Sequence, residues 1–213
     1  MKFLLFIILF SIIYPITAQE SLYKKFKALS RPEKCWVVWH PFIAKKTNQI
    51  SLEARKLANE ELKDSLLDGD GNGGQVDAFR HSLWMAMLVR EIRIKAAKKL
   101  GNAHEKGNYL DYKKHRTEDG TLPDAQSCQM DFLNNDAGIQ IGISLKNETL
   151  DSLKTYIKNE IITGKLWIIK KDKNGNFINC TGSILKSEDY LGKWENEKCI
   201  VSSDFRKKTI NNQ

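Results

Sequence analysis

The spacing of apolar and polar positions predicts a chain built mainly of α-helices. Residues 30–33 have the composition of a capping box with a proline early in the first turn, which predicts a helix that begins at Arg31. Pro41 is expected to interrupt this helix, and Ser51 to cap a second one over residues 52–66. Apolar residues at helical spacing predict further helices over residues 75–90, 91–105, 130–145 and 148–162, with a long polar loop over 106–127.

The helix expected over residues 75–90 has almost no polar side between Ala78 and Val89. A helix that is apolar all round is buried, so the charged residues near its start should be buried with it. Buried charged groups are nearly always paired. We therefore expect Asp77, Arg80 and His81 to meet partners from other helices.

One stripe of the helix expected over residues 130–145 carries the best candidates for such partners. Asp131, Asn135, Gly138 and Gly142 follow one another at helical spacing. Glycines inside a helix lower its stability, by roughly 1 kcal/mol each relative to alanine, so they indicate a close approach by a neighbouring element. We expect Trp84 to pack on the two glycines.

The C-terminal part changes character and predicts a small β-structure. Residues 165–172 and 176–181 flank an Asn-Gly pair, which is typical of a hairpin turn, and residues 190–201 could add a strand. The predicted fold is mainly α: a compact helical domain with a small C-terminal β-hairpin. Its parts are a helical domain over 19–163 with a motif core at 66–143, a hairpin extension over 164–204, and a flexible tail over 205–213.

The four cysteines allow three pairings, and none has the close spacing of a zinc knuckle. Cys180 and Cys199 lie together in the C-terminal part and are the best candidates for a disulfide. Cys35, beside Trp36, could equally be a buried free thiol.

The first eighteen residues have the pattern of a cleaved signal peptide. Lys2 precedes an apolar stretch over residues 3–13, and Ala18 offers a small residue at the cleavage point before Gln19. The apolar stretch is too short to span a bilayer, and no other stretch approaches its length. We therefore expect a secreted or periplasmic protein without a transmembrane anchor after signal cleavage.

The formal charge of +8 favours anionic partners such as phosphates, lipid head groups or cell-wall polymers. The lysines are scattered in pairs, so any single pair is also explained as a solvated surface. No basic stripe with interleaved aromatic residues gives a specific nucleic-acid signal.

Three short segments concentrate polar residues that could carry chemistry. They are Asp-Ala-Phe-Arg-His-Ser-Leu-Trp at 77–84, Ala-His-Glu at 103–105 and Met-Asp-Phe-Leu-Asn-Asn at 130–135. The candidate site residues in them are Asp77, Arg80, His81, His104, Glu105, Asp131, Asn134 and Asn135.

In this order, and with the Gly-rich stretch before them, the three segments resemble a helical domain of unknown function found in secreted bacterial proteins. Some members of that family look like C-terminal modules of toxin-like polypeptides. The resemblance covers about residues 66–143. It implies a helical fold and a set of positions, but it implies no reaction.

The residue types in the three segments suit a hydrolytic or metal-assisted centre. Two histidines and two carboxylates can supply a general base, a general acid and ligands for a divalent metal. Arg80 could clamp a phosphate or carboxylate, and Asn134 or Asn135 could orient a substrate or stabilise an oxyanion. Glu105 is the least central member, because it faces away from the apolar stripe of its own helix.

Two hypotheses follow from this group of residues. The first is an exported hydrolase that acts on an anionic or polymeric substrate outside the cytoplasm. The second is a non-enzymatic secreted binding module, in which Asp77, His81 and Arg80 form a buried hydrogen-bond network and Asn135 satisfies a helix end.

A third hypothesis is a calcium-stabilised envelope protein. Asp68, Asp70 and Asn72 hold the first, third and fifth positions of a calcium-binding loop, and Gly73 holds the sixth. The twelfth position is Phe79 instead of the bidentate Glu that such a loop requires. A flexible turn with an Asp as helix cap explains the same residues without a metal.

Overall fold

The structure is a computed structural model that describes residues 23–117 and 120–205. The predicted signal peptide over 1–18 and all but the first residue of the predicted tail lie outside these ranges. The order of elements is α2 (Arg31–Trp39), α3 (Pro41–Glu61), α4 (Gln75–Glu91), α5 (Ile94–Lys113), α6 (Ala125–Ser144), α7 (Leu150–Ile162), β1 (Trp167–Ile169), α8 (Ser187–Tyr190) and β2 (Ile200–Ser202). The predicted mainly α fold is confirmed.

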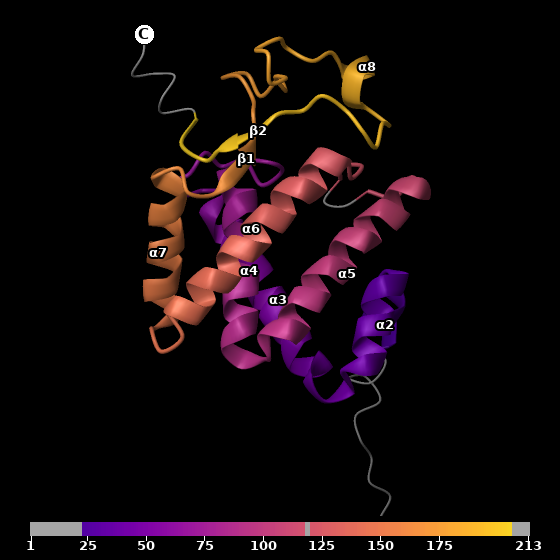
Figure 1. Ribbon diagram of the computed structural model, residues 1–213, viewed down its shortest axis with the longest axis vertical. Coiled ribbons are helices and arrows are strands. Elements are labelled where there is room, and N and C mark those ends of the chain that lie inside the picture. Colours follow the sequence, from indigo (N-terminus) through magenta and orange to yellow (C-terminus); the bar gives the residue numbers. More distant parts are fainter. Residues whose placement is uncertain (1–22, 118–119, 206–213) are drawn as a thin grey trace, which may run out of the picture.

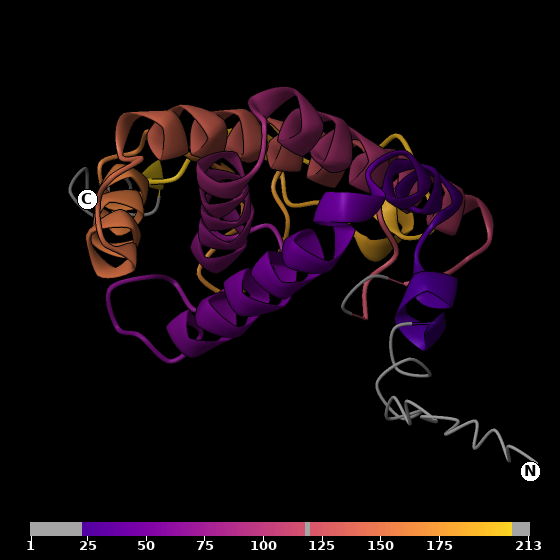
Figure 2. The ribbon, with the colours of Figure 1, turned by 90° about the horizontal axis from the view of Figure 1, so that it is seen from below.

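Helix α4 lies at the centre of the arrangement, with α6 on one side and α3 on the other (Figures 1 and 2). It also contacts α5, α7 and β1. Its side chains Phe79, Leu83 and Leu88 are fully buried. One apolar cluster joins α4 to α7 and β1, and a second joins it to α2 and α5. The absence of a solvent face on this helix, predicted from its sequence, is therefore confirmed.

The close contact between α4 and α6 depends on the two glycines of α6. A Cβ atom on Gly138 would come within 2.7 Å of the Ser82 Cα, and one on Gly142 within 2.7 Å of the Ala86 Cα. The prediction that Trp84 packs on these glycines was wrong, because the backbone of α4 lies against them. Trp84 points elsewhere and donates a hydrogen bond from its indole Nε1 to the Ser51 hydroxyl of α3, at 2.8 Å.

Several predicted helix boundaries are corrected, among them the start of α6, which lies at Ala125 instead of residue 130. Ser51 does not cap a helix, because α3 begins ten residues earlier at Pro41. The Ser51 hydroxyl instead donates to the Thr47 carbonyl within the helix, an alternative that Ser side chains always have. Helix α5 continues to Lys113 and so includes residues 106–113 of the predicted loop. Its extra turns include buried residues, Gly107 and Asn108 among them.

The start of α2 follows its sequence signal closely. The Ser30 hydroxyl accepts from the Glu33 backbone N–H, and the Glu33 carboxylate accepts from the Ser30 N–H at 2.8 Å. Helix α2 ends at Trp39, and α3 begins at the next proline. The two helices therefore meet at a tight corner around His40.

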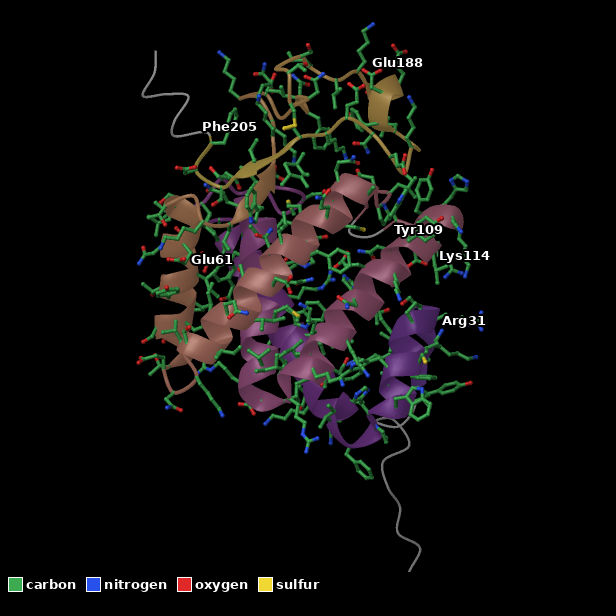
Figure 3. All side chains as sticks on the ribbon, viewed as in Figure 1. Arg31, Glu61, Tyr109, Lys114, Glu188 and Phe205 are labelled. Carbon is green, nitrogen blue, oxygen red and sulfur yellow. A yellow bond between two sulfur atoms is a disulfide. The ribbon has the colours of Figure 1, made fainter. Side chains whose placement is uncertain are left out.

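The C-terminal extension pairs differently from the predicted hairpin. Strand β1 is antiparallel to β2, with Ile168 opposite Val201, whereas the Asn-Gly turn closes only a single bridge between Lys171 and Phe177. The predicted disulfide between Cys180 and Cys199 is present, and it appears as a yellow bond in the extension in Figure 3.

The remaining two cysteines are free thiols: Cys128 is buried, but Cys35 is exposed, contrary to the buried alternative considered for it. Within the described residues, no helix has the length and apolar character needed to cross a membrane.

Candidate functional site

The packing of α4 on α6 brings four of the predicted site residues together. Asp77 and His81 are one helical turn apart on α4, and Asp131 and Asn135 are one turn apart on α6. The His81 Nε2 lies 3.3 Å from the Asp131 Oδ1 and 3.6 Å from the Asp77 Oδ1. Its Nδ1 lies 3.3 Å from the Asn135 Oδ1. We call these four residues the polar cluster.

The polar cluster is almost sealed from solvent. Asp77 and Asp131 are each 6% exposed, and His81 is 3% exposed. The burial expected from the apolar surroundings of α4 is confirmed for Asp77 and His81, whereas Arg80 is only partly buried, with 20% of its side chain exposed. The expected partners from another helix are found for His81, which contacts Asp131 and Asn135 of α6.

Arg80 supplies positive charge to the polar cluster. Its Nη2 lies 2.6 Å from the Asp77 Oδ1 and 3.2 Å from the His81 Nε2. One guanidinium faces two carboxylates, so Asp77, Asp131 and Arg80 together carry a net negative formal charge. A buried net negative charge favours a cation nearby.

The hydrogen bond at the His81 Nδ1 determines which ring nitrogen of His81 can act as a metal ligand. The Asn135 Oδ1 is an acceptor, so the His81 Nδ1 carries the proton of that contact and Nε2 is directed at the carboxylates. A histidine that ligates a metal has the same arrangement, with its second nitrogen donating to a carbonyl or carboxylate. The Nε2 atom and one oxygen from each of Asp77 and Asp131 all lie within 4.8 Å of one another. Such a set of nitrogen and oxygen atoms suits zinc or manganese.

A cleft opens beside the polar cluster. It has a volume of about 210 Å³ and lies among α2, α3, α4 and α5. His81 and His104 both line it, with their ring centroids 6.3 Å apart. The Trp84 ring lies edge-on to His104, at 5.5 Å between ring centroids. Half of the other lining residues are apolar, and among the polar ones Arg55 and Arg80 add positive charge and Glu33 adds negative charge.

Glu33 also belongs to the site, although the sequence pattern did not identify it as a site residue. Its Oε1 lies 3.1 Å from the His104 Nδ1, and its other carboxylate oxygen closes the capping box of α2. Burial acts to raise the pKa of Glu33, but the contacts with His104 and Ser30 outweigh it and lower that pKa. The capping-box pattern marked this residue as structural, and nothing in the sequence linked it to a histidine 71 positions away.

Glu105 and Asn134 lie outside the polar cluster. Glu105 is buried, contrary to its expected outward position, and accepts a hydrogen bond from Asn108 at 3.2 Å. Burial first, and then the nearby Glu105 and Asp131 carboxylates, raise the pKa of the Cys128 thiol. The Asn134 side chain exchanges two hydrogen bonds with the Trp167 backbone, at 2.9 and 3.0 Å, and so joins α6 to β1.

In the loop before α4, protein groups occupy the oxygen atoms of Asp68, Asp70 and Asn72 that a calcium ion would need. The Asp68 Oδ1 accepts from the backbone N–H groups of Asp70 and Gln75, at 2.9 and 3.0 Å. The Lys171 ammonium lies 2.6 Å from both the Asp70 Oδ2 and the Asn72 carbonyl oxygen. A calcium ion bound through Asp70 and Asn72 would have to displace that ammonium. The loop also supports the polar cluster, because the Gly73 N–H donates to the Asp77 Oδ2 at 2.7 Å.

Fold and site together define a mainly helical protein with a buried Asp–His–Asp group beside a cleft. The chain belongs to the family described as a domain of unknown function (DUF6973), whose model matches residues 34–165. No curated protein and no solved structure matches it significantly. The matched range contains the whole polar cluster and His104, whereas the disulfide lies beyond it. The predicted membership in a helical family of unknown function is confirmed.

Proposed function

We propose that this chain is an exported, metal-assisted hydrolase with its centre at Asp77, His81 and Asp131. The observation that carries the proposal is the orientation of the His81 ring. Its Nδ1 is directed at the Asn135 carbonyl oxygen, while its Nε2 faces one oxygen of each carboxylate. This arrangement favours a divalent cation among the three groups.

The surroundings support hydrolysis over simple storage of a cation. A bound divalent metal supplies a nucleophilic water at neutral pH. His104 faces the cleft and is oriented by Glu33, so it can exchange a proton with a substrate held there. Arg55 lines the same cleft and suits an anionic group of the substrate. The proposed substrate is therefore an anionic or polymeric compound with a hydrolysable bond.

Export is supported by two features at opposite ends of the chain. Residues 1–18 have the signal-peptide pattern, and the Cys180–Cys199 disulfide is typical of oxidising compartments. Mass spectrometry of exported material should find a chain that begins near Gln19. Exported protein that keeps an intact segment from Met1 to Ala18 would contradict this part of the proposal.

Metal binding is tested by calorimetric titration with Zn²⁺ and Mn²⁺. The parent protein should bind one equivalent, and His81→Ala and Asp131→Asn should each weaken binding at least tenfold. Asp136→Asn is the matched control, since Asp136 is an exposed carboxylate on the same helix that pairs with Lys98. Absence of saturable binding, or an equal loss in the control, would refute the metal centre.

Hydrolysis is tested with nitrophenyl carboxylic esters and phosphate mono- and diesters, with and without the metal that binds best. Asp131→Asn should abolish metal-dependent turnover. His104→Ala should lower turnover about a hundredfold while metal affinity stays unchanged, because His104 transfers protons and holds no metal. Activity that survives Asp131→Asn would contradict the assignment of the centre.

The second candidate is a non-enzymatic secreted binding module with a structural polar cluster. It is favoured by the 2.6 Å contact between the Arg80 Nη2 and the Asp77 Oδ1, since Arg80 can serve as the cation of the group. In this case His81→Ala should leave buried partners unsatisfied and lower the free energy of unfolding by roughly 1–3 kcal/mol. Because His81 is buried in both cases, thermal melts with and without added metal separate the two candidates: metal should raise the melting temperature of the parent protein but not of His81→Ala if the centre binds metal, and should change neither if the cluster is structural.

Arg80→Gln gives a further distinction. If a metal binds beside Asp77, removing the competing guanidinium should raise metal affinity, and added metal should raise the melting temperature of the variant. If Arg80 is the structural cation, the variant should be less stable, and metal should not restore it.

A further inference from the structure

Three apolar side chains stand out from the surface at the corner between α2 and α3. Val38 is 66% exposed, Trp39 is 77% exposed and Phe42 is 99% exposed. Single exposed apolar residues are common, but neighbouring aromatic residues on one protruding corner indicate an interaction surface. We call these three residues the aromatic corner.

The aromatic corner is held in position by a braced turn. His40, between the two helices, stacks on Trp36 with 4.5 Å between ring centroids, and its Nδ1 lies 2.8 Å from the Trp36 carbonyl oxygen. The Trp36 indole Nε1 in turn donates to the Ala96 carbonyl of α5 at 3.0 Å. The exposure of Trp39 and Phe42 is therefore a consequence of ordered packing beneath them.

A set of cations adjoins the aromatic corner. Arg93, Lys95 and Lys99 lie at the start of α5 and line one groove together with Trp39 and Phe42. The start of α5 and the α2–α3 turn lie at the same end of the molecule, the lower end in Figure 1. No acidic residue lines this groove, and among the described residues none of the three cations forms an ion pair. We call these three residues the basic flank.

We propose that the aromatic corner and the basic flank dock the protein on the surface of an anionic lipid bilayer. Trp and Phe side chains enter the boundary between head groups and acyl chains, while Lys and Arg extend their long stems toward lipid phosphates. A protein partner is less well matched, because lysine is depleted at the centres of protein interfaces. The inference is independent of the proposed hydrolase activity.

The test is co-sedimentation with vesicles of phosphatidylcholine alone and of phosphatidylcholine with an equal amount of phosphatidylglycerol. We expect binding to the anionic vesicles only, and weaker binding at higher salt. Each variant is compared with a parent protein that has the same N-terminus, so only the substitution differs.

Two double variants test the two parts of the surface. Trp39→Ala with Phe42→Ala should lower the partition coefficient at least tenfold. Lys95→Gln with Lys99→Gln should lower it about fivefold per residue, because each basic residue near an anionic surface contributes about that factor. If Trp39→Ala with Phe42→Ala fails to fold, as judged by circular dichroism, the result for Lys95→Gln with Lys99→Gln alone decides whether the proposal stands.

Matched controls make the same changes elsewhere. Leu191→Ala with Ile184→Ala removes two exposed apolar side chains of the C-terminal extension, and Lys56→Gln with Lys63→Gln removes two exposed positive charges near the far end of α3. These controls should bind anionic vesicles like the parent protein. Equal losses in controls and test variants would overturn the proposal. So would binding to neutral vesicles alone, or self-association through this corner without any lipid binding.

Discussion

Gly138→Ala is expected to destabilise the protein, although alanine is the better helix former. Gly138 lies inside α6, where replacing a glycine by alanine normally stabilises by about 1 kcal/mol. Here the new Cβ would lie 2.7 Å from the Ser82 Cα and 2.8 Å from its carbonyl carbon. These are backbone atoms of the buried helix α4, so no side-chain rotation can relieve the overlap.

The size of the effect follows from the two opposing contributions. Overpacking a well-packed contact destabilises by typically 1–3 kcal/mol, and a contact with backbone belongs at the upper end of that range. After about 1 kcal/mol of gained helix propensity, a net loss of about 2 kcal/mol remains. For a chain of this length, that lowers the melting temperature by about 4–8 °C.

Gly101→Ala on α5 is the matched control. Its Cβ would lie 3.5 Å from the Met85 Cε and 3.6 Å from the Asn135 Nδ2, which are ordinary contacts. The same substitution should therefore stabilise by up to about 1 kcal/mol. Urea and thermal denaturation of both variants measure the difference under identical conditions. A Gly138→Ala variant as stable as the Gly101→Ala variant would refute the close contact between α4 and α6.

Three further results are expected from the same measurements. Replacing Cys180 and Cys199 by serine should lower the free energy of unfolding by roughly 3 kcal/mol, because the disulfide closes a loop with a sequence separation of 19; an unchanged urea midpoint would contradict this. The pKa of Glu33 in the folded chain lies below its ordinary value of 4.5, so its contribution to stability is complete above pH 4.5 and is lost as the pH falls through the lowered pKa. The stability difference between the parent protein and Glu33→Gln should therefore shrink below about pH 4.5, and a difference that grows there would have the wrong sign. Asn134→Ala should destabilise by about 1–3 kcal/mol, because it leaves backbone groups of β1 without their partners, while leaving metal affinity unchanged.

The parts of the fold that could be predicted from the sequence are those with local signals. The capping box at residues 30–33 and the apolar surroundings of Asp77 and His81 depend on neighbours along one helix, and both predictions are confirmed. Ser51 shows the limit of such signals. A serine can cap a helix or donate to a carbonyl one turn back, and the sequence does not distinguish the two uses.

The missed features depend on residues far apart in the chain. The partner of β1 is β2, thirty residues beyond it, and the nearby Asn-Gly turn drew the prediction to the wrong pair. Glu33 reaches His104 only because α2 packs along α5. In Figure 3, Arg31 and Lys114 mark the ends of these helices that lie near each other. Contacts between residues far apart in the chain depend on tertiary packing, and the apolar pattern of one helix does not show which other element packs against it.

The polar cluster and the glycine contact are parts of one stripe of α6. Asp131 faces the His81 Nε2, and Asn135 faces the His81 Nδ1. Both residues precede Gly138 and Gly142 on the same side of α6. The glycines allow the α6 backbone to lie directly against α4, and this approach sets how far the short Asp and Asn side chains must reach. A larger residue at Gly138 would separate the helices and lengthen both contacts of His81. The glycines, which weaken α6 as an isolated helix, thus bring the carboxylate and the amide within reach of the histidine.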